Sequence, residues 1–143
     1  MPTRSMMPAG LAQRAEPETF RARSVSASLY VKDLQKSLVW YRDKIGFFVD
    51  EQIQRGGKLT AVALKAGDVR ILITQDDGGT GWDRVKGAGF ALQFTTAQDI
   101  DGLAEAIKQR GGFIETPPKL VGKTRVMQLK DPDGFRLVIS AST

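Results

Sequence analysis

The chain has 143 residues, of which 41% are hydrophobic and 26% charged, with a formal net charge of +5. This composition is typical of one globular domain with a buried core, and no apolar run reaches the ~18 to 20 residues of a membrane span, so a membrane partner is not expected. Cysteine and histidine are both absent: no disulfide supports the fold, we expect a cytoplasmic location, and the commonest metal ligand and general base are missing.

The first 23 residues differ from the rest of the chain. They hold three prolines and four arginines and show no apolar periodicity. They also lack the apolar core of a secretory signal. We expect a flexible N-terminal arm over residues 1–23, followed by one domain over residues 24–143.

A first structural unit can be read from residue 24 onward. Residues 24–31 alternate between apolar and polar side chains, which predicts a half-buried strand. Asp33 is a candidate N-cap for a helix over about 34–45, and Gly46 is placed to end it. Short apolar runs separated by glycine turns then predict strands at 47–54, 59–65 and 69–75. The unit is therefore βαβββ.

The same order of patterns returns after a glycine-rich linker, in which we interpret Asp76 and Asp77 as a solvated turn. Thr96 is a candidate helix N-cap, with Asp99 three residues further on. An apolar stripe continues this helix to Gly111-Gly112. Strands are expected at 90–95, 113–115, 124–130 and 135–141, so the second unit is again βαβββ.

The two units are related as copies. Arg70 and Arg136 stand 66 positions apart (136 minus 70), as do Leu72 and Val138 (138 minus 72). Such repeats pack together, because neither unit buries its apolar face alone. We expect an α+β fold in which two βαβββ modules, about 24–75 and 88–141, form a cup-shaped mixed sheet with helices on the outer face.

The concave side of this sheet is the expected ligand site. Strand alternation turns one polar and aliphatic face away from the helices, and such a cup suits a small ligand. Arg70 and Arg136 either bind an anionic ligand or are rim charges, and Trp82 in the linker is a candidate lid. Polar residues on the wet face of a strand also occur without any function. The expected ligand-binding residues are Ser26, Ser28, Tyr30, Arg70, Leu72, Trp82, Ala91, Gln93, Arg136 and Val138.

Two motifs carry a resemblance to a known family. Val31-Lys32-Asp33-Leu34, followed by Ile45-Gly46-Phe47, resembles the opening of the vicinal oxygen chelate superfamily of glyoxalases, bleomycin-resistance proteins and ring-cleaving dioxygenases. Lys130-Asp131-Pro132-Asp133-Gly134 before a strand resembles its second signature. The resemblance covers about residues 24–141 and implies the same two-module fold. It also implies a homodimer, with the modules of one cup coming from one chain or from two.

The resemblance also implies where a metal would bind. Enzymes of this superfamily usually hold a divalent metal at four cup positions filled by His, Gln or Glu. Carried over to this sequence, those positions are Ser26, Leu72, Ala91 and Val138. Serine is a poor ligand and the other three side chains have no donor atom, whereas a metal site needs about three suitable ligands. We expect no metal and no cofactor.

Three functions stay open. The first is metal-independent binding of an uncharged or anionic organic molecule in the cup. The second is a metal-free lyase or isomerase in which Tyr30 assists proton movement. Its catalytic residues remain unassigned, since we identify no cup-facing carboxylate to act as base. The third is an interaction module with a vestigial cup. Nucleic-acid binding is not expected, because the basic residues lack interleaved aromatics and a groove-reading helix.

Overall fold

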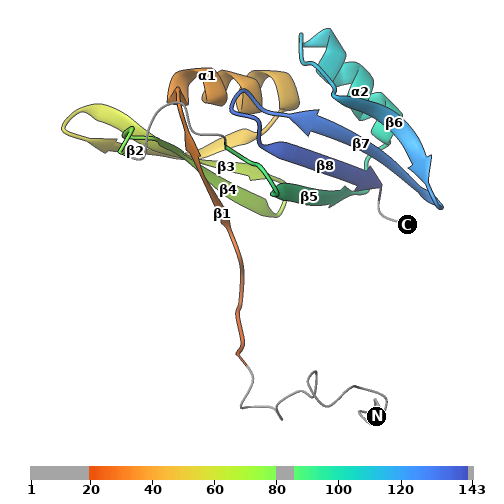
Figure 1. Ribbon diagram of the computed structural model, residues 1–143, viewed down its shortest axis with the longest axis horizontal. Helices are drawn as coiled ribbons and strands as arrows, with labels where there is room; N and C mark the ends of the chain where they lie inside the picture. The colour runs from red at the N-terminus through yellow and green to blue at the C-terminus, as the bar shows by residue number, and fades with distance from the viewer. Residues whose placement is uncertain (1–19, 80–85, 142–143) are drawn as a thin grey trace.

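The chain folds into two βαβββ modules that follow one another in sequence, as Figure 1 shows for this computed structural model. The structure describes residues 20–79 and 86–141, so the expected arm at residues 1–23 lies mostly outside the described residues. The first module contains β1 (Ala27–Val31), α1 (Leu34–Val39), the π-helical η2 (Trp40–Ile45), β2 (Phe48–Arg55), β3 (Lys58–Ala66) and β4 (Val69–Gln75). The second contains β5 (Ala91–Thr96), α2 (Ile100–Gln109), β6 (Thr116–Val121), β7 (Thr124–Lys130) and β8 (Arg136–Ala141). The predicted α+β fold of two such modules is confirmed.

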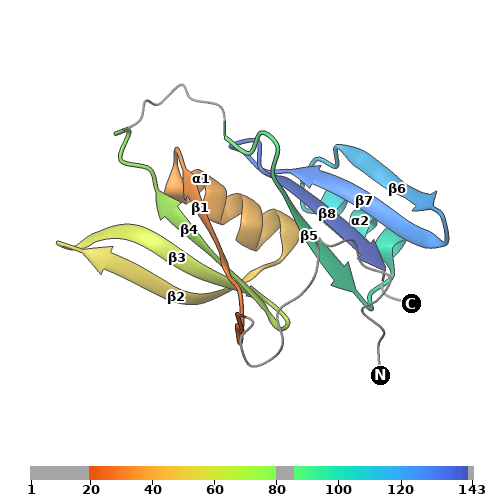
Figure 2. The same cartoon turned by 60° about the horizontal axis from the view of Figure 1, so that its bottom comes forward.

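Each module forms its own four-stranded mixed sheet. The strand orders are β1-β4-β3-β2 and β5-β8-β7-β6. The first strand of each module runs parallel to its last strand, and the remaining neighbours are antiparallel. A parallel pair needs a long crossover, which the helix and the intervening strands supply. Helix α1 lies over one face of the first sheet and α2 over one face of the second (Figure 2). Within the described residues, no ladder joins the two sheets.

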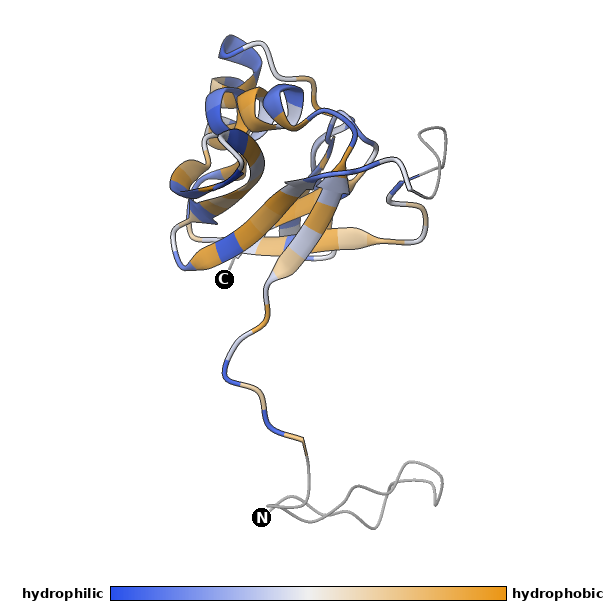
Figure 3. Cartoon of the chain, turned by 90° about the vertical axis from the view of Figure 1, so that its left-hand side faces the viewer, coloured by the Kyte–Doolittle hydropathy of each residue, from blue (hydrophilic) through white to orange (hydrophobic). Residues whose placement is uncertain are grey.

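One hydrophobic core lies between the sheets and the helices. Apolar residues dominate the strands, whereas the helices carry both apolar and polar residues (Figure 3), as expected for helices that turn one side to a core. No helix in the described parts of the chain is long and apolar enough to cross a membrane. The core includes Leu29, Val31, Leu38, Tyr41, Phe47, Val62, Leu64, Ile71, Ile73, Ile100, Ile107, Met127, Leu129, Leu137 and Ile139.

The ends of the first helical segment follow the predicted signals. The Asp33 side chain accepts a hydrogen bond from the Lys36 backbone N–H at 3.2 Å, so Asp33 is the N-cap. Gly46 ends the segment with φ of 107°, a left-handed conformation that favours glycine. The segment closes in π-helical form, with the Gly46 N–H donating to the Tyr41 carbonyl at 3.0 Å.

Two sequence predictions in the second module are wrong. The N-cap of α2 is Asp99, which accepts from the Gly102 N–H at 3.0 Å, and not Thr96. Thr96 is still in β5, opposite Ala141, so its backbone is extended. The strand expected at 113–115 is instead β6, Thr116–Val121. Two prolines hide this strand in the sequence, and a sheet tolerates them because β6 is an edge strand.

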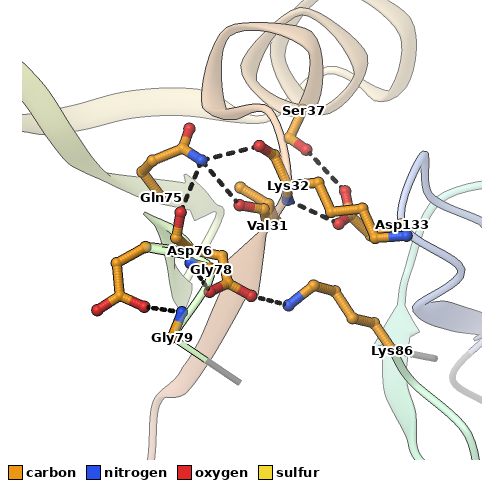
Figure 4. A network of polar contacts seen from close by, with 10 residues as sticks. Val31, Lys32, Ser37, Gln75, Asp76, Gly78, Gly79, Lys86 and Asp133 are labelled. Carbon is orange, nitrogen blue, oxygen red and sulfur yellow. Dashed lines mark hydrogen bonds and ion pairs between the residues drawn. The ribbon is translucent and has the colours of Figure 1, made fainter. Parts of the chain in front are cut away.

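A turn of the second module fastens the two modules together. The Asp131 carboxylate accepts from the backbone N–H groups of Asp133 at 2.9 Å and Phe135 at 2.8 Å, and from the buried Tyr41 hydroxyl at 2.7 Å. Asp133 accepts from the Lys32 N–H at 2.8 Å and lies 3.5 Å from the Ser37 hydroxyl (Figure 4). The Asp-Pro-Asp-Gly motif therefore connects module two to the end of β1 and to the first helix.

A buried ion pair closes the same junction. Lys86 Nζ lies 2.5 Å from Asp76 Oδ2, and the two side chains are only 2% and 5% exposed (Figure 4). The expectation of a solvated turn at Asp76 is therefore wrong, although Asp77 is exposed. Next to this pair, a Cβ on Gly87 would lie 2.8 Å from the Gly134 carbonyl oxygen, and the φ of Gly87 is +77°. A side chain here would separate the linker from the turn.

The junction predicts a large effect of losing Asp131. Asp131→Ala leaves the buried Tyr41 hydroxyl and two N–H groups without their acceptor, and we expect it to lower the free energy of unfolding by about 3 kcal/mol. Asp131→Asn keeps the shape and offers an amide to the same groups, so it should cost much less. Urea denaturation at neutral pH measures both variants. An alanine variant as stable as the wild type would contradict the fastening role.

Comparing the wild type with Asp131→Asn also tests how the contribution of Asp131 to stability depends on pH. Burial raises the pKa of the Asp131 carboxyl above its usual 3.8, while hydrogen bonds from Tyr41 and the backbone N–H groups oppose the rise. A raised folded-state pKa means that the stability linked to this proton is fully present below the unfolded pKa and is lost as pH rises through the folded pKa. Asp131→Asn should therefore gain stability relative to wild type as pH rises from about 4, near the unfolded pKa, through the raised folded-state pKa. A pH-independent difference would argue against this origin.

Candidate functional site

The face of the first sheet that turns away from α1, which we call its outward face, carries four of the ten expected ligand residues. Ser28 lies opposite Leu72 in the ladder between β1 and β4, and Tyr30 lies opposite Thr74. Their neighbours in each strand, such as Leu29 and Ile73, are buried in the core. Because side chains alternate along a strand, Ser28, Tyr30, Arg70 and Leu72 lie on the side away from α1.

The second sheet repeats this arrangement. Ala91 lies opposite Arg136, and Gln93 opposite Val138, in the ladder between β5 and β8. Leu137 on the other side of the sheet is buried. The ladder pair of Gln93 and Val138 thus occupies the place in module two that Ser28 and Leu72 occupy in module one.

The two remaining expected residues are placed differently. Ser26 is exposed and precedes the first residue of β1, Ala27, so it has no ladder partner. Trp82 lies outside the described residues. The other eight residues fall into two sets of four, one on each sheet. Within one chain, the four residues of each set lie together on one sheet. The two sets lie on separate sheets.

Ion pairs stand at matched places on both outward faces. Arg70 Nη2 lies 3.2 Å from Glu51 Oε2, and its Nε lies 3.3 Å from Asp50 Oδ2. In module two, Arg136 Nε and Lys130 Nζ each lie 3.3 Å from an oxygen of Glu115. The two arginine side chains stay 51% and 44% exposed, so these pairs are screened by water and add little to stability.

The sequence analysis missed the two glutamates. Glu51 lies opposite Ala63, which is itself opposite Leu72, so Glu51 shares the outward face. The expectation that no carboxylate lies on the ligand face of the sheets, the face away from the helices, is therefore wrong. A register shift between Val49 and Glu51 breaks the strand alternation that would have placed Glu51. Glu115 was missed because it directly precedes β6, whose start was predicted incorrectly.

These faces offer hydrogen bonds and apolar contact. Ser28 and Tyr30 supply hydroxyls, Gln93 supplies an amide, and each arginine keeps guanidinium N–H groups beyond those that meet a carboxylate. Leu72 and Val138 supply aliphatic surface between them. Such a mixture orients and holds a small organic molecule.

The same residues do not fit a divalent metal. The family-like positions Leu72, Ala91 and Val138 have no donor atom. Their ladder neighbours Ser28 and Gln93 add one hydroxyl and one amide. Within residues 20–79 and 86–141, no group of three or more His, Cys, Asp or Glu side chains could hold a metal ion. A tight site needs about three charged or imidazole-type ligands.

Comparison with known proteins gives one family match. The family model of the Glyoxalase/Bleomycin resistance protein/Dioxygenase superfamily matches residues 23–139. No curated protein matches the sequence.

Solved structures share the fold at low sequence identity. UcmS2 is 18% identical with a TM-score of 0.71, and the match covers 86% of this chain and 100% of UcmS2. A glyoxalase/bleomycin resistance protein/dioxygenase from Alicyclobacillus acidocaldarius is 17% identical with a TM-score of 0.65, covering 82% of this chain and 89% of its own. Virulence protein STM3117 from Salmonella typhimurium is 20% identical with a TM-score of 0.61, covering 87% and 100%. At these identities the likeness shows the fold alone.

The donor set predicts that the purified protein carries no bound divalent metal. Elemental mass spectrometry of tag-free protein should find metal far below one ion per chain. Chelator, or added zinc, manganese or nickel, should leave the melting temperature unchanged, because the described residues offer no group of ligands through which a metal would bind and stabilise the folded state. A near-stoichiometric metal that raises the melting temperature would show that the donor set is read wrongly.

Proposed function

Since the chain belongs to the Glyoxalase/Bleomycin resistance protein/Dioxygenase superfamily, we propose that it binds an uncharged or anionic small organic molecule on the outward faces of its sheets without a metal. The observation that carries this proposal is the chemistry of those faces. They combine hydroxyl, amide and guanidinium donors with aliphatic side chains, and the positions where a metal would be expected hold serine, leucine, alanine and valine. Binding therefore rests on hydrogen bonds and apolar contact.

The ion pairs suggest how an anionic ligand is oriented. On the first sheet, Arg70 is shared by two carboxylates, Asp50 and Glu51, and Lys65 lies opposite it in the β3–β4 ladder, so two cations stand near two carboxylates. On the second sheet, the two cations Arg136 and Lys130 share the single carboxylate of Glu115. Positive charge is thus in excess beside Arg136, and an acidic group of the ligand is expected there.

A second candidate is a metal-free lyase or isomerase of the same fold. It is favoured by Glu51, a carboxylate on the outward face that is 60% exposed and able to take a proton from a ligand. Tyr30→Phe should then reduce turnover, whereas binding alone would be little affected.

The interaction-module alternative predicts that no small molecule binds either face. Cell fractionation tests the expected cytoplasmic location.

The binding proposal predicts a preference among three probes that share one body: phenylpropionate, phenylpropanol and phenylpropylamine. Phenylpropionate and phenylpropanol should shift the backbone amide signals of β4, β5 and β8 in a two-dimensional NMR titration. Arg136→Gln should weaken the binding of phenylpropionate about two- to fivefold, because a partly exposed charge contact is lost, and should leave the affinity for phenylpropanol unchanged. Arg55→Gln, an exposed arginine at the end of β2, is the matched control. Unchanged strand signals with every probe would remove the proposal.

The sheet edges support a homodimer. Among the strands of residues 20–79 and 86–141, β1 and β5 each lie at the end of a sheet and have one neighbouring strand, so the other edge of each is open to a further strand. The two opposite edge strands carry protection against pairing: Asp50 and Glu51 in β2, and Pro117-Pro118 in β6. In contrast, β1 (ASLYV) and β5 (ALQFTT) contain no charge and no proline. These two edges suit association with another chain.

A twofold dimer would cover both edges at once. If β1 of one copy lies beside β5 of the other, both β1 and β5 edges are used and the assembly closes. Pairing like with like would leave one edge open in each copy or produce an extended polymer. In the closed arrangement, Ser28 and Leu72 of one copy lie in the same concavity as Gln93 and Val138 of its partner. Each binding site then draws residues from two chains.

The dimer predicts a directional effect of edge charges. Sedimentation should show a dimer for the wild type, and Ser28→Lys combined with Gln93→Lys should shift it toward monomer, because lysine opposes strand association. Gln52→Lys in the already charged β2 is the control and should leave the dimer intact. A wild type that sediments as a monomer would contradict the arrangement, as would a double lysine variant that stays dimeric.

A further inference from the structure

A cavity lies between the two modules, apart from the outward sheet faces. Its volume is about 430 Å³, within the range of small-molecule sites. Its walls come from the end of η2, the β3–β4 turn, the end of β5 and the first turns of α2. None of the residues expected to bind ligand on the sheet faces lines it.

The interior of this cavity is apolar. Phe47 and Phe94 stand edge to face, with ring centroids 6.1 Å apart and planes at 75°. Leu103 from α2 and Ile139 from β8 complete the apolar wall. A compact aromatic or aliphatic body would fit there by packing against these side chains.

The polar side chains of the lining are the neutral Thr95, Thr96 and Gln98 and the acidic Asp68. Asp68, in the β3–β4 turn, is the one charged side chain among the described residues that line the cavity. It is exposed, and it has no hydrogen bond or ion pair with any described residue. Nearby Arg70 is turned to Glu51 and Asp50. Arg110, beside Gly46, donates to the carbonyls of Lys44 and Ile45 and does not line the cavity.

We propose that this junction cavity is a second small-molecule site, which takes an amine carried on a compact apolar body. The apolar part lies against Phe47, Phe94 and Leu103, and the ammonium group meets the Asp68 carboxylate. This ligand class is the opposite of the anionic or uncharged class proposed for the sheet faces. The inference therefore stands independently of that function.

Occupation of this site has a consequence for the whole fold. The walls belong to both modules, so a bound ligand adds contacts across the junction that exist only in the folded chain. Ligands that bind the folded state alone raise its melting temperature in proportion to the logarithm of their concentration. A rise in melting temperature with amine concentration accompanies binding at this place.

The test uses the same three probes on the full-length protein. Phenylpropylamine should shift the amide signals of residues 45–47, 66–68 and 97–98, which line the cavity outside β1, β4, β5 and β8, more strongly than phenylpropanol does. Phenylpropionate should not shift them. Asp68→Asn should weaken the binding of the amine about two- to fivefold, so that its affinity becomes similar to that of the alcohol. Glu105→Gln, which removes an exposed carboxylate of α2 outside the lining, is the matched control.

A variant that fills the cavity and keeps Asp68 tests the location of the site independently of its charge. Ala97 is exposed and lines the cavity, so Ala97→Phe should fill the space without disturbing the core, and should weaken the amine about tenfold or more. Amine shifts confined to β1, β4, β5 and β8 would place the ligand on the sheet faces and overturn the inference. Junction shifts with no preference for the amine would overturn the ligand class, and absence of any shift at millimolar probe would overturn the site. Loss of phenylpropionate binding alone concerns the proposed function only.

Discussion

The arrangement of this protein depends on how one carboxylate-rich turn of the second module binds the first. Asp131 is held by its own turn through two backbone N–H groups, which leaves its second oxygen for the hydroxyl of Tyr41. Burial and the neighbouring Asp131 carboxylate raise the pKa of Tyr41 far above its ordinary range, so this hydroxyl stays protonated and donates. The contact sets where the helical segment of module one lies against module two. It thereby fixes Tyr41 within the core that the two modules share.

The buried pair of Lys86 and Asp76 completes the same region from the linker side. Burial of two charges is costly unless each finds a partner, so the pair is better understood as fixing the path of the chain than as a large source of stability. Asp76 also accepts from the Gly78 N–H at 2.9 Å, which adds to its compensation. Gly87 also lies close to the backbone of Gly134 and Phe135, so this position has no room for a side chain. Both modules are held through polar contacts as well as through the core.

The repeat is symmetric in backbone and asymmetric in chemistry. Both modules present a strand pair with an uncharged polar residue opposite an aliphatic one, and both place an arginine beside a glutamate. Yet module one surrounds its arginine with two carboxylates, whereas module two surrounds one carboxylate with two cations. A duplicated unit thus offers two different surfaces, and this difference can distinguish the two ends of an asymmetric ligand. Shared fold with distant relatives says little about such differences, because function depends on the residues of the site.

The sequence by itself determined the order of the elements and the face of each central strand. Asp33, Gly46 and the alternation around Leu72 and Val138 are local signals, and strands 69–75 and 124–130 were predicted with the bounds that the structure has. Local signals failed where the chain departs from regular pairing, as at the register shift beside Glu51, or where prolines stand in the edge strand β6. Only the tertiary structure decided the partners of Asp131, Asp133 and Asp76, and hence the junction and its cavity. Tyr41 and Asp131 are 90 positions apart, and no periodicity in either segment specifies which buried hydroxyl a turn carboxylate will meet once the two modules pack.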